Sequence, residues 1–358
     1  MLWILILLFI LFALVNCWQH DLRLVRLVGR VSYDGTEFRG WQSQGQRDVD
    51  PEVKQHRYSK SKRTIQDLMN KMIRRRFNMN NLHVTGSSRT DSGVHAKGQA
   101  FHFDLPMEAC MRDASSKRVN KGDGALDLSF LEYSLNRMLP IDCKVHNISY
   151  APTIMVKGDR EDGSLESIVI PSLYKVEYED KYDYRLDSYF HAISSAKRKK
   201  YVYRFCIAGH VDPCQKRYVS HFWHPKFNMA IFEECLNLFE GTHNFRAFAN
   251  QIERTERVAS YLLDPPKSIN TIKHIYSVKL IDEGDGYYAV EFILTSALYR
   301  MVRNIVGTCK MCAENEISLD FVRSILENES DRYDRTSNPA LAATAEGLCL
   351  HQVYFDQY

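Results

Sequence analysis

The stretch HVTGSSRTDSGVHAKGQAFHFDL, residues 83–105, joins two strand-like segments through a loop rich in glycine and serine. The second segment alternates, with Phe101 and Phe103 on one face and small or polar residues on the other, which is typical of a β-strand. Asp91 lies in the loop two residues after Arg89, and its small neighbours allow a sharp turn that exposes the carboxylate. Two interpretations are open: a turn aspartate bonded to nearby N–H groups, or a carboxylate held out for chemistry.

Around this loop, strand-like and helix-like segments alternate. Residues 22–35 and 199–207 are rich in β-branched or aromatic side chains, whereas residues 64–77 place apolar side chains at helical spacing behind Thr64, a plausible N-cap. The same order of strand and helix recurs after about residue 189. We therefore expect an α+β fold with two similar modules around an antiparallel sheet, helices on its outer side and a basic central cleft.

The pattern along the chain predicts four regions. They are a hydrophobic segment (1–20), an N-terminal α+β module (21–150), an acidic insert or linker (151–188) and a C-terminal α+β module (189–358). Three stretches are predicted to be loops: 43–63, 106–127 and 153–188. The last is polar and acidic around an apolar centre, so it is either a hairpin excursion or a partly disordered insert.

The charge is nearly balanced, with 47 Lys and Arg against 44 Asp and Glu among 358 residues. This balance does not by itself indicate a nucleic-acid-binding protein, but the basic residues are clustered. One run is formed by Arg74, Arg75 and Arg76, and another by Lys197, Arg198, Lys199 and Lys200. Such runs are ordinarily solvated faces, and the alternative is a local positive field that attracts a polyanion.

The nine cysteines are scattered, so a disulfide framework is not expected. Cys309 and Cys312 form a CxxC with no second pair at zinc-site spacing. Their spacing also suits one face of a helix, and we predict no metal site.

The first 18 residues, MLWILILLFILFALVNCW, are almost uninterrupted apolar sequence. This length is at the short edge of a membrane-spanning helix. No Lys or Arg precedes the segment, and Arg23, Arg26 and Arg30 follow it. A signal-anchor that contacts a membrane, a cleaved or organellar signal, and a mispredicted start all remain open.

Seven segments in order resemble the TruA family of tRNA pseudouridine synthases. The strongest is GSSRTDSGVHAKGQAFHF at 86–103, which is similar to the family's active-site motif. The others are YDGTEFRGWQSQ (33–44), TIQDLMNKM (64–72), LNRMLP (135–140), FHAISSAKRKKYVYRF (190–205), FEGTHNFRAF (239–248) and the pair LYRMVRNIVGT (298–308) and AEGLCL (345–350). The pattern looks nearest to the pseudouridine-synthase-like branch seen in animals.

The resemblance implies roles for individual residues. It makes Asp91 the catalytic aspartate, Arg89 the arginine that displaces and holds the target nucleotide, and Tyr201 the tyrosine that stacks on the base. It also implies that Arg303 pairs with the aspartate and that Leu348 lines the pocket. Core packing is the alternative for Tyr201 and Leu348, and a surface helix position for Arg303. The basic run 197–200 would place positive charge beside this pocket.

The resemblance further implies the pseudouridine synthase fold, isomerisation of a uridine in tRNA or in another RNA, no cofactor, and a homodimer. It leaves an intracellular location open between mitochondrion and cytosol. Ile193 and Asn270 stand where arginine is common in the family. These departures leave open a catalytically idle RNA-binding or chaperone homologue, and the apolar residues 1–18 leave open a membrane-tethered interaction module.

Overall fold

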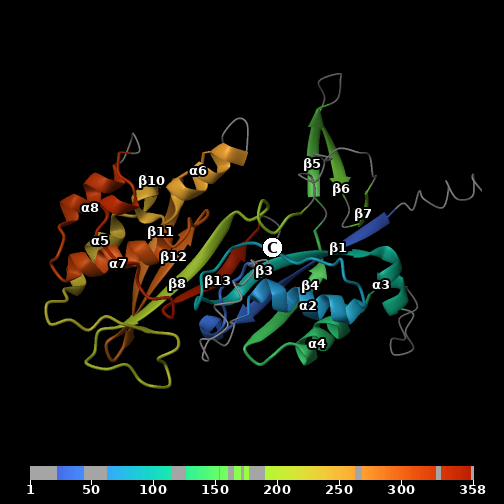
Figure 1. Cartoon of the computed structure of the whole chain (residues 1–358), viewed down its shortest axis with the longest axis horizontal. Helices are drawn as coiled ribbons and strands as arrows, with labels where there is room; N and C mark the ends of the chain where they lie inside the picture. The colour runs from blue at the N-terminus through green and yellow to red at the C-terminus, as the bar shows by residue number, and fades with distance from the viewer. Residues whose placement is uncertain are drawn as a thin grey trace, which may run out of the picture.

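A computed structural model describes residues 22–43, 63–114, 126–152, 154–159, 165–170, 173–176, 190–262, 268–327 and 332–355. Its centre is an 11-stranded sheet in which the main path runs β10-β11-β12-β8-β13-β3-β1-β4 (Figure 1). These strands are β1 (Leu22–Tyr33), β3 (His95–Pro106), β4 (Cys143–Tyr150), β8 (Arg198–Cys206), β10 (Gly241–Asn244), β11 (Ile272–Gly284), β12 (Tyr287–Leu294) and β13 (Leu348–Tyr354). Short strands β2 (Thr85–Gly86), β7 (Leu173–Val176) and β9 (Ser220–His221) pair beside this path.

The helices complete an α+β fold, as the sequence predicts. They are α2 (Ile65–Phe77), α3 (Met107–Ala114), α4 (Leu128–Met138), α5 (Met229–Asn237), α6 (Ile252–Leu262), α7 (Met301–Ala313) and α8 (Leu319–Leu326), with 3₁₀ turns η1 (Gly35–Glu37), η4 (Arg246–Phe248) and η5 (Arg335–Ser337). In Figure 1, α2 and α4 lie over the N-terminal strands, whereas α5, α7 and α8 accompany the C-terminal ones. The predicted N-cap of α2 is confirmed, because the Thr64 side chain accepts a hydrogen bond from Asp67 N.

One short parallel pairing joins the two halves of the sheet. Strand β13, from the end of the chain, pairs with β3 at Ala96↔Leu350 and with β8 at Tyr201↔Leu350. Residues directly opposite each other on paired strands share a face, so these three side chains point to the same side of the sheet. Phe205 of β8 packs there against Phe232 of α5, with ring centroids 5.0 Å apart. This face therefore carries the helices and the core.

At the junction, Gly98 of β3 lies against the backbone of β13. A Cβ added to Gly98 would stand 2.5 Å from the carbonyl oxygen of His351. No L side chain is compatible with that separation unless one of the strands moves. Gly98 therefore permits the close approach that makes one sheet out of two halves.

The predicted loops are only partly correct. Residues 107–114, expected to lie in a loop, form α3, because Ala109 and Cys110 are buried beside the sheet. Sequence inspection also missed α6 and α8. Helix α5 ends at Asn237, four residues before Gly241, although a glycine often marks the end of a helix. Gly241 instead begins β10 at a positive φ of 106°.

The insert contains strands in its described parts. Strands β5 (Ile154–Asp159) and β6 (Leu165–Ile170) form an antiparallel hairpin, and β7 pairs with the first four residues of β1. Residues 177–189 and the hydrophobic segment 1–20 lie outside the described residues, so the regional boundaries stay a prediction. Within the described ranges, no helix has the length and apolar character needed to cross a bilayer.

The chain re-enters the described structure on the opposite face of the N-terminal strands. Arg26 of β1 forms two hydrogen bonds to Asp104 of β3 (2.7 and 2.8 Å) and donates to the carbonyl oxygen of Phe190 (2.7 Å). Beside it, Nδ1 of buried His102 accepts from the backbone N of Ala192 at 3.1 Å. These bonds fix the start of the C-terminal half on the N-terminal half.

We predict that Gly98→Ala lowers the free energy of unfolding by about 1–3 kcal/mol, because the new methyl group forces β3 and β13 apart. Urea denaturation measures the change. Gly209→Ala is the matched control, since its Cβ would meet no heavy atom within 4 Å. Equal effects of the two substitutions would contradict the close-approach account.

We also predict an acid-sensitive fold that depends on His102. Burial, with help from Arg26 and His191, lowers the pKa of His102 from 6.5 to about 3, although Asp104 opposes the shift. Between these values the unfolded chain binds a proton that the folded chain does not, so stability falls as the pH drops from about 6.5 towards 3. This group contributes a slope of about 1.4 kcal/mol per pH unit.

Urea denaturation at several pH values between 4 and 7.5 tests this prediction. His102→Asn should be less stable at pH 7.5 but should show a shallower loss of stability on acidification. His210→Asn changes an exposed histidine and should leave the slope unaltered. A His102→Asn protein with the original slope would show that other groups control the acid response.

Candidate active site

The loop that carries Asp91 is held by the backbone on both of its sides. Ser87 N donates to Ala100 O of β3 at 2.8 Å, and Trp41 N donates to Thr90 O at 3.1 Å. The second contact needs Gly40, whose φ is +88° and whose Cβ would lie 2.4 Å from Thr90 O. The turn at residues 87–93 is therefore a fixed element rather than a free connection.

Asp91 meets an arginine from the other half of the chain. Arg303, in the first turn of α7, places Nη1 3.0 Å from Asp91 Oδ2, and the two side chains are only 11% and 14% exposed. Arg303 Nε also donates to Ala343 O at 2.7 Å, which fixes the guanidinium from behind. The pairing that the resemblance implied is thus present, across 212 residues of sequence. A charged hydrogen bond in a half-buried place orients the carboxylate strongly.

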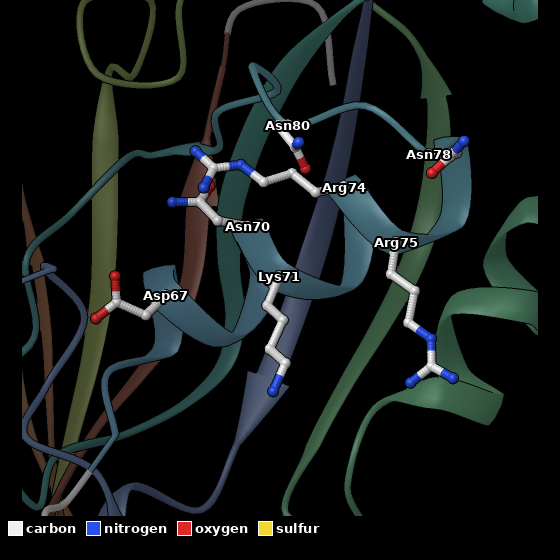
Figure 2. A pocket seen from close by; sticks show the side chains of 7 residues that line it. All are labelled: Asp67, Asn70, Lys71, Arg74, Arg75, Asn78 and Asn80. Atoms are coloured by element: carbon white, nitrogen blue, oxygen red, sulfur yellow. The ribbon is translucent and has the colours of Figure 1, made fainter.

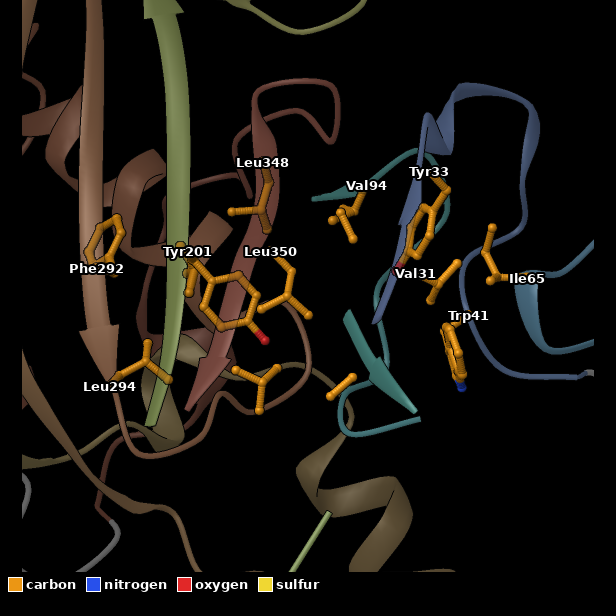
Figure 3. Packing of buried hydrophobic residues seen from close by; sticks show 14 of the residues in the cluster. Val31, Tyr33, Trp41, Ile65, Val94, Tyr201, Phe292, Leu294, Leu348 and Leu350 are labelled. Carbon is orange, nitrogen blue, oxygen red and sulfur yellow. The ribbon is translucent and has the colours of Figure 1, made fainter. Parts of the chain in front are cut away.

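Tyr201 lies on the other side of the loop. Its hydroxyl is 2.9 Å from Ser88 Oγ, and the side chain is 5% exposed. Figure 3 shows its ring between Leu294 and Leu350, with the hydroxyl directed towards the N-terminal half. Burial raises the pKa of Tyr201 to about 12, so the hydroxyl stays protonated at neutral pH. Its role in base stacking stays a prediction. The same holds for every other residue role that the resemblance implied.

Arg89 and Leu348 differ in their surroundings. Arg89 is exposed on the loop that carries Asp91. Leu348 is 6% exposed and belongs to the hydrophobic core, so it contacts a bound base only if that base reaches the core surface. The core-packing alternative for Leu348 fits this position.

The basic run does not form one surface, because strand β8 divides it. Lys197 precedes β8 and is exposed, whereas Arg198 stacks on Tyr276 at 4.4 Å and Lys200 pairs with Glu291 at 2.5 Å. Lys199 lies on the same face as Tyr201, is 7% exposed, and donates to Ser87 O at 2.9 Å. The four side chains therefore do not share one face, because side chains alternate along a strand. RNA contact by the exposed members stays a prediction.

A polar depression of about 350 Å³ lies along α2 (Figure 2). It is lined by Asp67, Asn70, Lys71, Arg74, Arg75, Asn78 and Asn80. Arg74 has a structural bond, from Nε to Leu82 O at 2.7 Å. Lys71 and Arg75 are exposed, lie one turn apart, and form no ion pair or hydrogen bond within the described part of the chain. Like charges at this spacing weaken a helix slightly, so they favour an anionic ligand.

The CxxC pair lies on one face of α7, as its spacing predicts. Cys309 and Cys312 are buried, and Cys312 Sγ is 3.6 Å from Cys235 Sγ of α5. Burial raises the pKa of Cys309, which favours the neutral thiol. Among the residues that the structure describes, no cluster of three or more His, Cys, Asp or Glu side chains has the arrangement of a metal site.

Sequence inspection missed the residues that support the loop. Gln99 Nε2 donates to Ser88 O, Thr90 Oγ1 is 2.8 Å from Tyr33 OH, and Lys199 was assigned to the surface. One sequence feature could have identified two of them. Alternation along a strand places Gln99 on the same face as Phe101 and Lys199 on the same face as Tyr201, so each is a polar residue on an apolar face.

Comparison with known proteins indicates one class, the tRNA pseudouridine synthases. Residues 236–356 match the family model described as tRNA pseudouridine synthase. Over 326 residues, the chain is 27% identical to tRNA pseudouridine synthase A 1 of Protochlamydia amoebophila, covering 91% of this chain and 94% of the relative. It is 28% identical to tRNA pseudouridine synthase A of Geobacillus kaustophilus (91% and 93% covered) and of Bacillus subtilis (93% and 100% covered).

The Asp91 loop is thus held between two halves of one sheet, in a chain whose likeness to the A-type tRNA pseudouridine synthases extends over more than nine tenths of its length. Its C-terminal part, residues 236–356, also matches the family model of these enzymes.

Proposed function

We propose that this protein isomerises a uridine in tRNA to pseudouridine, with Asp91 as the catalytic residue. The observation that supports this most directly is the pairing of Asp91 with Arg303 at 3.0 Å on a loop fixed to both halves of the sheet. A carboxylate in this setting has one defined direction of approach to a substrate.

The substrate nucleotide has to leave its helix before it can reach Asp91. Base flipping costs a few kcal/mol, and contacts in the pocket offset that cost. Exposed Arg89 is placed to hold the backbone of the displaced nucleotide, and the ring of Tyr201 offers a stacking surface. A base that stacks there displaces groups that now cover the Tyr201 ring.

The chemistry breaks the bond between ribose C1′ and uracil N1 and forms a bond from C1′ to C5. Asp91 either attacks C1′ to form an ester or removes a ribose proton to start an elimination. In both routes the uracil turns within the pocket, and the proton on C5 leaves after the new bond forms. The reaction only rearranges uridine, so it requires no external oxidant, reductant or phosphoryl donor. Arg303 balances the charge of the carboxylate when the ester or the proton is released.

Binding of the RNA backbone is supported by cations on the loop and on α2. Arg89 belongs to the catalytic loop, while Lys71 and Arg75 line the depression along the helix that begins beside it. Together they form a route for phosphates from the catalytic loop along α2.

Three parts of the proposal rest on sequence resemblance and composition. They are a homodimer, an intracellular location in mitochondrion or cytosol, and membrane contact through residues 1–18. Sedimentation of the purified protein and fractionation of cells with and without residues 1–18 test them separately. A membrane tether changes the location of the enzyme without changing its chemistry.

We predict that Asp91→Asn abolishes pseudouridine formation, on the order of 10³-fold or more, because the amide is neither a nucleophile nor a base. Release of tritium from uracil C5 of labelled tRNA measures turnover. Asp285→Asn makes the same chemical change in a turn with a φ of 53° and should retain full activity. Normal turnover by Asp91→Asn would refute the mechanism, and RNA binding without turnover by the native protein would favour an idle RNA-binding homologue.

We predict that Arg89→Gln weakens tRNA binding and lowers its salt dependence. Loss of one phosphate contact reduces the slope of log K against log[salt] by about 0.7–0.9. Filter binding between 50 and 300 mM salt measures it. Arg323→Gln removes an arginine on α8, at the outer end of the C-terminal half, and should leave the slope unchanged (Figure 1). An unchanged slope for Arg89→Gln would exclude phosphate contact by this residue.

A further inference from the structure

Lys199 is a buried cation in a place where a strand would ordinarily present an apolar side chain. On β8 it occupies the face shared by Tyr201, Tyr203 and Phe205, and it is only 7% exposed. Among the described residues it forms no ion pair. Burying an ammonium group without a carboxylate costs free energy, which indicates a role other than stability.

The position of the ammonium group indicates that role. Lys199 Nζ donates to the carbonyl oxygen of Ser87 at 2.9 Å, four residues before Asp91. The next carbonyl, that of Ser88, accepts from Gln99 Nε2, and Ser88 Oγ meets the hydroxyl of Tyr201. The start of the catalytic loop is thus bound to β8 and β3 through three side chains.

The surrounding polar atoms are not fully satisfied. In the described part of the chain, the buried atoms Ser87 Oγ and Gln99 Oε1 have no hydrogen-bond partner. Buried polar atoms without partners are uncommon in folded proteins, so each one requires an explanation. Ser87 belongs to the loop, and Gln99 holds it through the carbonyl oxygen of Ser88. These buried polar side chains therefore position the loop and do not maximise stability.

We propose that Lys199 is a positioning residue, which fixes Ser87 and thereby the distance between the Asp91 carboxylate and the ring of Tyr201. The inference rests on the proposed function and adds a residue to the machinery of the same site. It also replaces the expectation that Lys199 contacts RNA. Burial lowers the pKa of Lys199 to about 8, so the group still carries a proton at neutral pH and can donate.

The decisive experiment separates positioning from RNA contact in the full chain. Lys199→Met is compared with Lys279→Met, which removes the same charge from an exposed position on β11. A displacement of about 1 Å at a reacting group can cost about 100-fold in rate. We expect kcat on tRNA to fall 10- to 100-fold for Lys199→Met, with an unchanged KM and an unchanged salt slope of binding. Lys279→Met should retain kcat.

Two further variants keep the test informative. Lys199→Arg retains a cationic donor and should recover most of kcat. Lys199→Gln, which keeps a polar side chain but shortens its reach, replaces Lys199→Met if that protein does not fold, and the same loss of kcat is expected. Thermal unfolding of each variant establishes that it is folded.

The outcomes discriminate between the explanations. A normal kcat for folded Lys199→Met, or a salt slope lower by about one, would overturn the positioning role. Failure of Lys199→Arg to recover activity would also count against it. If the native protein itself forms no pseudouridine, the proposed function fails, whereas an active native protein with an active Lys199→Met variant refutes only this inference.

Discussion

The parallel pairing of β3 with β13 is the constraint on which the site depends. It is short, with Ala96↔Leu350 and His95↔Cys349 as its paired residues, and it joins the first module of the chain to the last strand. Because β13 also pairs with β8, only β13 separates β8, which carries Tyr201, from β3, which follows Asp91. Without this junction, the two halves would carry their functional side chains separately.

The Asp91 loop takes support from both halves of the sheet. The N-terminal half supplies backbone bonds from Trp41 and to Ala100, and the C-terminal half supplies Arg303 and Lys199. The net contribution of each such hydrogen bond to the free energy of unfolding is only about 0.5–1.5 kcal/mol. Their combined effect is geometric, because several bonds from different directions leave the loop one conformation.

Local sequence patterns predicted much of the fold because their causes are local. The N-cap at Thr64, the helix that follows it and the alternation around Phe101 and Phe103 depend on neighbouring residues alone. The loop of Asp91 was also found from its small, turn-forming neighbours, and the ordered motifs indicated its partner Arg303. Helix α3 was missed although Met107, Cys110, Met111 and Ala114 recur at helical spacing, because the helix is short and lies inside a longer polar stretch that was interpreted as a loop.

The basic run shows where sequence reasoning reaches its limit. Four consecutive cations read as one patch, yet a strand directs adjacent side chains to opposite faces. The direction of Lys199 was predictable from the period of Tyr201 and Tyr203, but its partner was not. The carbonyl of Ser87 lies 112 residues away in sequence, and only the assembled sheet brings it within reach.

The hydroxyl groups of Tyr201 and Ser88 form a hydrogen bond of 2.9 Å that joins the Asp91 loop to β8. A ligand that opens it has to compensate for a hydrogen bond between groups that are otherwise shielded from water, worth about 1 kcal/mol or about fivefold in affinity. Molecules that fill the space without restoring that bond bind more weakly by this factor. Selectivity at this site therefore depends first on the hydrogen bond that a ligand must break, and only then on the contacts that the ligand itself forms.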